Sequence, residues 1–234
     1  MTGFEALYPF LYPSADEPPG DDDAREREVF AEVRRSTRDK VAEIAALRAR
    51  VLATYADELV GCAGAMAAAF AAGGRLFSFG NGGSSTDAQA VAEMFSAPGD
   101  PGAGLPAIAL TADVAVLTAL SNDVSFEVVF ARPLAASGQP GDIALGLSTS
   151  GNSANVLRGF AEARRQGMVT VGLAGYDGGR MAEVDTVDHL FVMPSSSVHR
   201  IQEAQTTVYQ VLGELTLAAL SCPGRPAGGP GSPG

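Results

Sequence analysis

The chain has 234 residues, 46% of them hydrophobic, which is enough to bury a sizeable core in one large or two small domains. Disorder along the whole chain is therefore excluded. The 16 Lys and Arg residues are outnumbered by 27 Asp and Glu residues, and the formal net charge is -11 at pH 7. This balance argues against nucleic-acid binding as a main role, because it provides no general cationic surface for phosphate backbones.

The two ends of the chain differ in composition from the rest. Residues 1–24 contain several prolines, an acidic run at Asp21-Asp22-Asp23 and aromatic residues without helical or strand spacing. We predict a flexible acidic arm there, which either docks on a neighbouring subunit or is a frayed terminus. Residues 222–234 consist almost entirely of Pro, Gly, Ala and Ser, so a disordered tail is predicted.

Targeting and metal-binding patterns are weak. The start of the chain lacks the cationic region of a secretory signal. The most apolar stretch, Gly61 to Gly74, is about fourteen residues, short of the roughly 20 that span a bilayer. We therefore expect a soluble, cytoplasmic protein without a membrane partner. The only cysteines, Cys62 and Cys222, and the only two histidines form neither a disulfide framework nor a conventional zinc cluster.

Periodicity predicts an α/β fold. From residue 25 to about residue 72, apolar residues recur at helical spacing, which predicts two N-terminal helices. After Gly73-Gly74, short apolar runs alternate with helical segments, which is typical of a parallel sheet. The predicted strands are Arg75 to Phe79, Pro106 to Leu110, Asp142 to Leu147, Val169 to Leu173 and His189 to Met193. We predict one three-layer α/β domain over residues 25–221, including the two helices.

Two loops at strand ends indicate an anionic ligand. Gly80-Asn81-Gly82-Gly83-Ser84-Ser85-Thr86-Asp87 follows the first strand and enters a helix that runs to about Phe95. Ser148-Thr149-Ser150-Gly151-Asn152-Ser153 follows the third strand and precedes a helix from Ala154 to Gln166. Glycines and helix N-termini bring free N–H groups to an anion, and hydroxyls add neutral donors. The P-loop and dinucleotide-binding glycine patterns are missing, so a phosphorylated sugar fits better than ATP or a dinucleotide.

With these loops, the sequence resembles the sugar isomerase (SIS) family, and within it the phosphoheptose isomerases. The resemblance covers about residues 38–220 and rests on five segments: Gly80 to Ser84, Leu120-Ser121-Asn122-Asp123, Gly141 through Ser153, Tyr176-Asp177-Gly178-Gly179 and Arg200-Ile201-Gln202-Glu203. It implies a flavodoxin-like, five-stranded parallel sheet in a homotetramer with sites near subunit interfaces. It also implies interconversion of sedoheptulose 7-phosphate and an aldose heptose phosphate.

The resemblance assigns substrate-binding roles to matching residues. The serine-rich loop would hold the phosphate, while Asn81, Asn122, Asp123 and Gln202 would face the sugar hydroxyls. The full set of expected binding residues is Asn81, Gly82, Gly83, Ser84, Asn122, Asp123, Ser148, Thr149, Ser150, Ser153 and Gln202.

The family's catalytic positions are altered. In the isomerases, the helix after the first loop carries a His and, four residues later, a Glu; the last helix carries a Gln and, eight residues later, a His. Together they bind zinc and include the acid/base pair. The corresponding residues here are Ala90, Met94, Gln202 and Gln210. Without the His, Glu and His, we expect no zinc and no other cofactor.

Other residues are candidates for proton transfer. His199 precedes Arg200-Ile201-Gln202, and Glu203 lies four residues further on the same helical face. The alternative for His199 is a surface or helix-capping role. Glu127 is a further carboxylate near the expected cleft. Glu93 adjoins the family's Glu position but is rotated by about 100° on a helix, and His189 is expected to be a packed or edge-strand residue.

Two functions remain open at this point. One is a phosphosugar ketose–aldose isomerase that works without zinc. The other is a non-catalytic SIS module that binds a phosphosugar and a protein partner, similar to the bacterial replication-initiator-associating SIS protein, which works as a tetrameric adaptor. Both would be homo-oligomers, most simply tetramers. A purely structural helical scaffold would leave the two anion-binding loops unexplained.

Overall fold

The computed structural model describes residues 22–97 and 104–221, and side chains from residue 25 onward. The predicted tail and residues 1–21 of the predicted arm lie outside this part. The chain divides into two units, one ending at Ala46 and the other beginning at Leu47. No helix in the described ranges is both long and apolar enough to cross a membrane.

A single helix, α2 (Asp22–Ala71), replaces the two helices predicted from the sequence. The prediction was wrong because nothing in this segment stops a helix: it contains no proline, and its only glycines are Gly61 and Gly64. In the first unit, large apolar side chains of α2 are exposed, including Phe30 (57%) and Val41 (61%). In the second unit, α2 contributes buried residues to the core: Leu47, Val51, Leu59, Cys62 and Met66.

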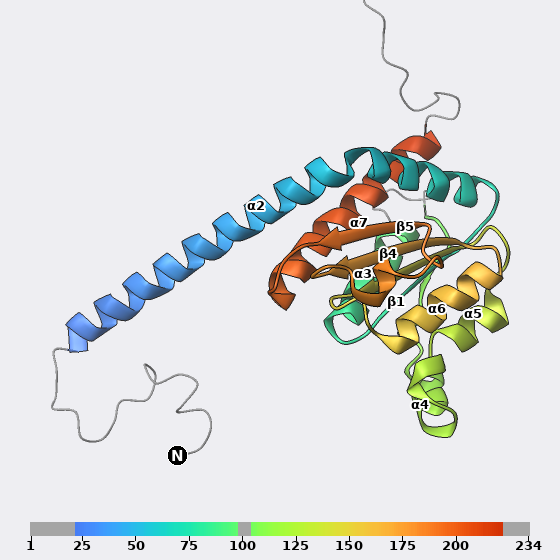
Figure 1. The fold of residues 1–234 in the computed structure, drawn as a ribbon, viewed down its shortest axis with the longest axis horizontal. Coiled ribbons are helices and arrows are strands. Elements are labelled where there is room, and N and C mark those ends of the chain that lie inside the picture. The colour runs from blue at the N-terminus through green and yellow to red at the C-terminus, as the bar shows by residue number, and fades with distance from the viewer. Residues whose placement is uncertain (1–21, 98–103, 222–234) are drawn as a thin grey trace, which may run out of the picture. The chain divides into compact units, whose positions relative to one another are not determined.

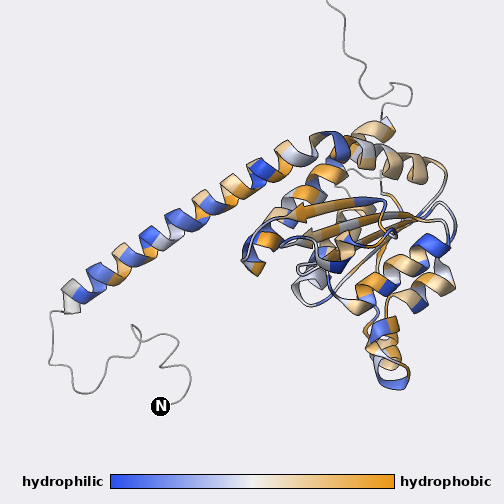
Figure 2. Ribbon diagram, viewed as in Figure 1, coloured by the Kyte–Doolittle hydropathy of each residue, from blue (hydrophilic) through white to orange (hydrophobic). Residues whose placement is uncertain are grey.

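All five predicted strands are present in one parallel sheet of order β2-β1-β3-β4-β5. Strands β1, β4 and β5 are labelled in Figure 1. They are β1 (Leu76–Gly80), β2 (Ala107–Ala109), β3 (Ile143–Ser148), β4 (Val169–Gly175) and β5 (His189–Met193). Their apolar composition is visible in Figure 2. Strands β1 and β3 are buried along their whole length, as expected of a parallel sheet covered on both faces. The flavodoxin-like fold expected from the sequence is confirmed.

Helices cover the sheet in two groups. Helix α3 (Gly83–Ser96) packs against α7 (Val198–Ser221), and both contact the sheet; α6 (Ala154–Arg165) packs against α5 (Ala131–Ser137) and contacts β3 and β4. Helix α4 (Val114–Asp123) precedes the short 3₁₀ turn η2 (Phe126–Val128), and η3 (Gly179–Ala182) follows β4. Sheet and helices together form the predicted three-layer arrangement (Figure 1).

An aromatic cluster anchors the start of the first loop. The ring of Phe79, the penultimate residue of β1, lies 5.3 Å from the rings of both Phe130 and Phe160. Gly146 on the neighbouring strand makes room for them, because a Cβ atom there would lie 2.5 Å from Cζ of Phe160. This packing holds the end of β1, and therefore the loop that follows, in a defined position.

Candidate functional site

The two glycine- and serine-containing loops lie next to each other. Strands β1 and β3 are neighbours, with Gly80 paired to Leu147, so the loops that follow them start side by side at the carboxyl edge of the sheet. After β1 the chain continues to β2 on one side, and after β3 it continues to β4 on the opposite side. The direction in which strands are added therefore reverses between β1 and β3, which makes this the switch point of the sheet. Ligands of open α/β sheets bind in this crevice.

The first loop turns directly into α3. Gly82 has φ of 56°, a left-handed conformation that glycine adopts without strain, and Ser85 N donates to Gly82 O at 2.9 Å. Ser84 is buried, while Gly82 and Gly83 are exposed. A side chain on Gly83 would collide with the carboxamide of Gln202 on α7. The structure therefore brings the predicted Gln202 against the glycine loop.

A pair of amides joins the two loops. Asn81 Nδ2 donates to Asn155 Oδ1 and Asn155 Nδ2 donates to Asn81 Oδ1, each at 2.8 Å. Asn155 lies in the first turn of α6 and is 3% exposed. Its Oδ1 also accepts from Val156 N at 3.0 Å. Sequence reasoning missed Asn155, although it follows the serine loop by only two residues.

The serine loop closes on itself above the N-terminus of α6. Ser148 Oγ lies 3.1 Å from Ser153 Oγ and accepts from Gly151 N at 3.1 Å. Ser150 Oγ accepts from Asn152 N at 3.2 Å. Ser153 occupies the N-cap position of α6, but its side chain makes no capping hydrogen bond. Ser153 therefore leaves N–H groups at the start of α6 uncapped, although Asn155 Oδ1 accepts from Val156 N in the same turn, and a helix N-terminus of this kind can bind an anion.

The segment after β4 supports the serine loop from behind. Gly151 has φ of 66°, and a side chain there would collide with the carbonyl oxygen of Gly178. Asn152 Oδ1 accepts from Arg180 N at 2.9 Å, and Met181 N donates to Gly151 O at 2.9 Å. These contacts give the Tyr176-Asp177-Gly178-Gly179 segment a structural role beside the serine loop. They connect the loop to the backbone of the segment after β4.

The candidate base His199 is exposed in the first turn of α7. Among the described residues its imidazole makes no hydrogen bond. Glu203, which was expected to orient it, pairs with Arg200 at 2.5 Å, and the backbone oxygen of Glu203 accepts from Arg48 at 3.2 Å. His189 lies on the edge strand β5, as expected, with Nδ1 2.6 Å from Glu58 Oε1.

The α4–η2 segment carries three other predicted site residues. Asn122 and Asp123 end α4, are both exposed, and are joined by a hydrogen bond of 2.7 Å. Glu127 in η2 forms an ion pair with Arg158 on α6 at 2.6 Å. Within the described part of the chain, no hydrogen bond or ion pair connects these three residues to the two loops.

Two of the four positions that match the family's zinc ligands, Met94 and Gln202, lie in the contact between α3 and α7. Met94 packs on Gly213, where a Cβ atom would lie 2.6 Å from both Sδ and Cε of Met94. Gln210 is exposed, and Ala90 has no donor atom. The described residues include no group of three or more His, Cys, Asp or Glu side chains able to hold a metal ion. Two carboxamides and a thioether are not a donor set that suits zinc.

Asp87 lies in the same helix contact, one turn after Gly83. Its Oδ1 lies 3.5 Å from the Tyr209 hydroxyl, and its Oδ2 is shielded from solvent without a hydrogen-bond partner in the described structure. Burial raises the pKa of Asp87 above its ordinary value, and burial also raises the pKa of Tyr209. Sequence reasoning did not single out Asp87, although it ends the first loop motif.

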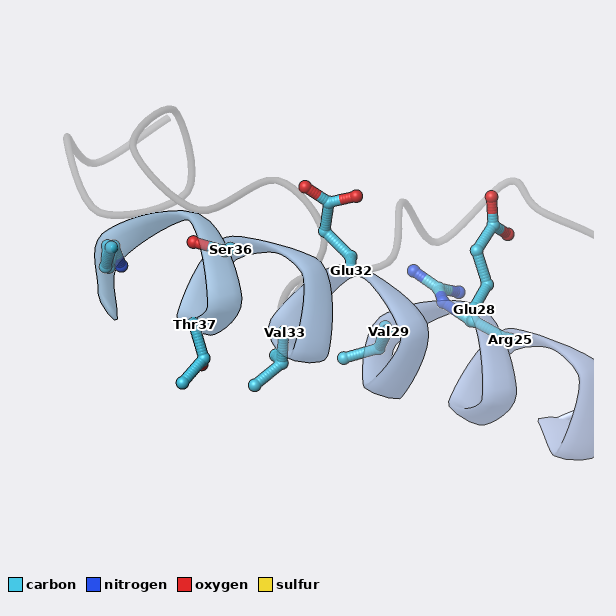
Figure 3. A pocket seen from close by; sticks show the side chains of 8 residues that line it. Arg25, Glu28, Val29, Glu32, Val33, Ser36 and Thr37 are labelled. Carbon is cyan, nitrogen blue, oxygen red and sulfur yellow. The ribbon is translucent and has the colours of Figure 1, made fainter. Parts of the chain in front are cut away.

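A separate hollow of about 630 Å³ borders the N-terminal part of α2 (Figure 3). All of its described lining residues belong to this one helix: Arg25, Glu28, Val29, Glu32, Val33, Ser36, Thr37 and Lys40. Val29, Val33 and Thr37 line up along one side of the helix. Side chains from a single helix do not converge on a ligand, so we assign no site there.

Comparison with known proteins identifies the family. A family model described as "SIS domain" matches residues 41–175, which contain both loops and more than half of the chain. The chain belongs to the SIS domain family. Within this SIS chain, the matched region includes β1, β3 and the candidate binding residues up to Ser153, whereas Gln202 and Tyr209 lie beyond it.

Curated relatives and solved structures agree with this assignment. The SIS chain is 42% identical over 174 residues to the phosphoheptose isomerase of Aquifex aeolicus, covering 74% of this chain and 90% of that protein. It is 45% identical over 170 residues to the phosphoheptose isomerase of a Roseiflexus species, and the match covers 72% of this chain and 85% of that protein. The solved phosphoheptose isomerase of Neisseria gonorrhoeae superposes with a TM-score of 0.72 at 32% identity, covering 78% and 97%. The solved phosphoheptose isomerase of Francisella tularensis superposes with a TM-score of 0.71 at 29% sequence identity, covering 77% of this chain and 96% of that one.

Proposed function

We propose that this SIS protein binds a sugar phosphate at the two loops and acts as a phosphoheptose isomerase-like ketose–aldose isomerase. The observation that carries the proposal is the preformed serine loop at the N-terminus of α6, locked by Ser148, Ser153 and the Gly178–Arg180 support. Such a site offers backbone N–H groups and hydroxyls to a phosphate. The relatives' names, phosphoheptose isomerase, supply the expected substrate class.

The glycine loop and α7 complete the proposed site. Asn81 is held by Asn155, and Gln202 rests on Gly83, so two carboxamides border the same crevice as the serine loop. Carboxamides both donate and accept hydrogen bonds, which suits sugar hydroxyls. We propose that Asn122 and Asp123 also face the sugar, as the family resemblance implies.

The proposed isomerase works without zinc. The donor set at the family's metal positions does not fit the ion, since Met94 is packed on Gly213 and Gln210 is exposed. Proton transfer then depends on side chains of the chain itself, for which His199 and Glu127 are the candidates from the sequence.

A non-catalytic phosphosugar-binding adaptor is the second candidate function. It is favoured by the same loss of metal-binding and acid/base side chains, with the binding loops kept. In this case the bound sugar phosphate would regulate contact with a protein partner rather than undergo a reaction.

We also propose a homo-oligomer, most simply a tetramer. Around α4, apolar side chains are exposed in the single chain: Ile108 (45%), Val114 (63%), Val124 (54%) and Phe126 (51%). Contact with further copies of the chain would bury these side chains. Light scattering measures the state directly, and a monomer at micromolar concentration would contradict the proposal.

A binding screen tests the proposed function. Thermal unfolding should shift upward with sedoheptulose 7-phosphate, and calorimetry should then give its affinity. Each hydrogen bond to a charged phosphate contributes about 1.5–3 kcal/mol, so Ser150→Ala/Ser153→Ala should weaken binding by about tenfold or more. Ser137→Ala, at the exposed end of α5, is the matched control and should bind like the wild type. Equal affinity of the double variant and the wild type would exclude the serine loop as the phosphate site.

A further inference from the structure

The contact between α3 and α7 brings two rows of residues together. On α3 the row is Gly83, Asp87, Ala90 and Met94; on α7 it is Gln202, Thr206, Tyr209 and Gly213. Both rows have spacings of four, three and four residues, which place their members on one face of a helix. Three cross-contacts pair the rows in order: Gly83 with Gln202, Asp87 with Tyr209 and Met94 with Gly213.

Asp87 is the one carboxylate in these two rows of described residues. Gly83, where Gln202 touches the glycine loop, is one helical turn away, about 5.4 Å along the axis. Two other carboxylates near the site are engaged by arginines, Glu127 by Arg158 and Glu203 by Arg200, and Asp123 accepts a hydrogen bond from Asn122. In the described structure no cation pairs with Asp87.

The environment of Asp87 stabilises its protonated form relative to an exposed aspartate. Among the described residues, its one hydrogen-bond partner is the distant Tyr209 hydroxyl, and Oδ2 is shielded from solvent without a partner. An anion left without donors in a buried place is unstable, and this desolvation is what raises the pKa of Asp87. A carboxyl with a raised pKa is a stronger base at neutral pH than an arginine-paired one. Perturbed carboxyls of this kind gather at catalytic sites.

We propose that Asp87 is the proton-transfer residue of a zinc-independent isomerisation in this protein, with Tyr209 as its positioning residue. The proposal rests on the proposed binding of a sugar phosphate at the two loops. It adds a residue that neither the loop motifs nor the altered zinc positions indicated.

The chemical step balances without a co-reactant. The Asp87 carboxylate takes a proton from the hydroxyl-bearing carbon next to the ketose carbonyl. The electron pair of the broken C–H bond forms the C=C bond of an enediolate, and the carbonyl oxygen takes the negative charge. The hydroxyl proton of the first carbon then passes to that oxygen, and Asp87 returns its proton to the former carbonyl carbon. The product is the aldose, and no electrons enter or leave.

Deuterium exchange on a bound substrate tests the proposal. Sedoheptulose 7-phosphate is incubated with the full chain in D₂O, and NMR follows loss of the carbon-bound proton. Asp87→Asn should lower the exchange rate by about 10²- to 10⁴-fold, the usual contribution of a general base. Its affinity for the same sugar phosphate, measured by calorimetry, should stay within about threefold of the wild type.

Three further variants make the result specific. Glu93→Gln, an exposed carboxylate on the same helix but off the contacting face, is the matched control and should leave exchange unchanged. Tyr209→Phe should slow exchange less than Asp87→Asn, because it removes a hydroxyl that only orients the carboxyl. Asp87→Glu should restore part of the rate, which a merely structural aspartate would not do. Thermal unfolding of each variant confirms that it is folded.

Two outcomes would overturn the proposal. One is that the wild type binds the sugar phosphate but exchanges no carbon-bound proton. The proposed binding would then stand, and Asp87 would have no catalytic role. The other is undiminished exchange in Asp87→Asn, in which case loss of exchange in His199→Ala would assign the proton transfer to His199. If the wild type does not bind at all, the calorimetry shows that the proposed function itself has failed.

Discussion

Asn81 on the loop after β1 and Asn155 on α6 exchange two hydrogen bonds of 2.8 Å through their side-chain amides. The pair links the glycine loop to the helix whose N-terminus receives the serine loop. Neither amide is free to rotate without breaking two bonds. The two halves of the candidate site are therefore positioned as one unit.

Asn155→Ala should weaken both folding and binding. It leaves the Asn81 amide without its partner in a partly buried place, which costs about 1–3 kcal/mol of unfolding free energy. Urea denaturation measures this loss, and calorimetry should show weaker binding of sedoheptulose 7-phosphate. Gln139→Ala, which removes an exposed carboxamide, should change stability by less than about 0.5 kcal/mol. If both variants lose the same stability, the amide pair has no special role.

Gly151→Ala should disrupt the serine loop. The new methyl group would meet the carbonyl oxygen of Gly178, and the residue would also be strained at φ of 66°. Left-handed strain alone costs about 1–2 kcal/mol. Gly167→Ala isolates that strain, since Gly167 has φ of 74° with only ordinary contacts around it. Calorimetry should show binding lost in Gly151→Ala and retained in Gly167→Ala; retention in both would contradict the preformed loop.

Met94 and Gly213 should show coupled stability effects. Gly213→Ala inserts a methyl group 2.6 Å from Met94 Sδ and should destabilise the fold by about 1–3 kcal/mol. Met94→Ala in the same chain should recover part of this loss, which a double-mutant cycle in urea measures. Gly61→Ala, at a helical position with open space, should instead stabilise by about 0.5–1 kcal/mol. Strict additivity at residues 94 and 213 would mean that they do not touch.

The protein purified without chelators should hold far less than one zinc per chain. Ala90, Met94 and Gln210 replace three of the family's four ligands, so no tetrahedral donor set remains. Elemental analysis gives the ratio, and added chelator should leave the unfolding temperature unchanged. About one zinc per chain, lost in Gln202→Ala, would show that the metal position had been misassigned.

Asp87 should make stability fall as pH rises. Its pKa is raised above the ordinary value of 3.8, so the folded state binds this proton more tightly than the unfolded state. That stability is fully present below about pH 3.8 and is lost as pH rises through the folded-state pKa. Asp87→Asn carries no charge at any pH. Its unfolding temperature relative to wild type should therefore rise between pH 3.5 and 7, and a constant difference would refute the buried-carboxyl description.

The sequence by itself determined the five strands of the sheet, the two anion-binding loops that follow the first and third strands, and the family. Buried parallel strands need continuous apolar runs, and anion-binding turns need glycine and hydroxyl residues at fixed places, so both are local features of the chain. The number of N-terminal helices was predicted wrongly, because periodicity shows where a helix packs but not where it ends. Only a proline or a glycine-rich break would have shown an end, and α2 has neither before Gly61.

Only the tertiary structure decided which polar side chains meet. Asn81 and Asn155 are 74 residues apart in sequence, and Asp87 and Tyr209 are 122 apart. Their meeting depends on the strand order and on the packing of α3 against α7, which no local pattern encodes. The same holds for Glu203, which pairs with Arg200 and not with His199. A side chain's chemistry at a site depends on its partners and its burial, and both are properties of packing over long sequence distances.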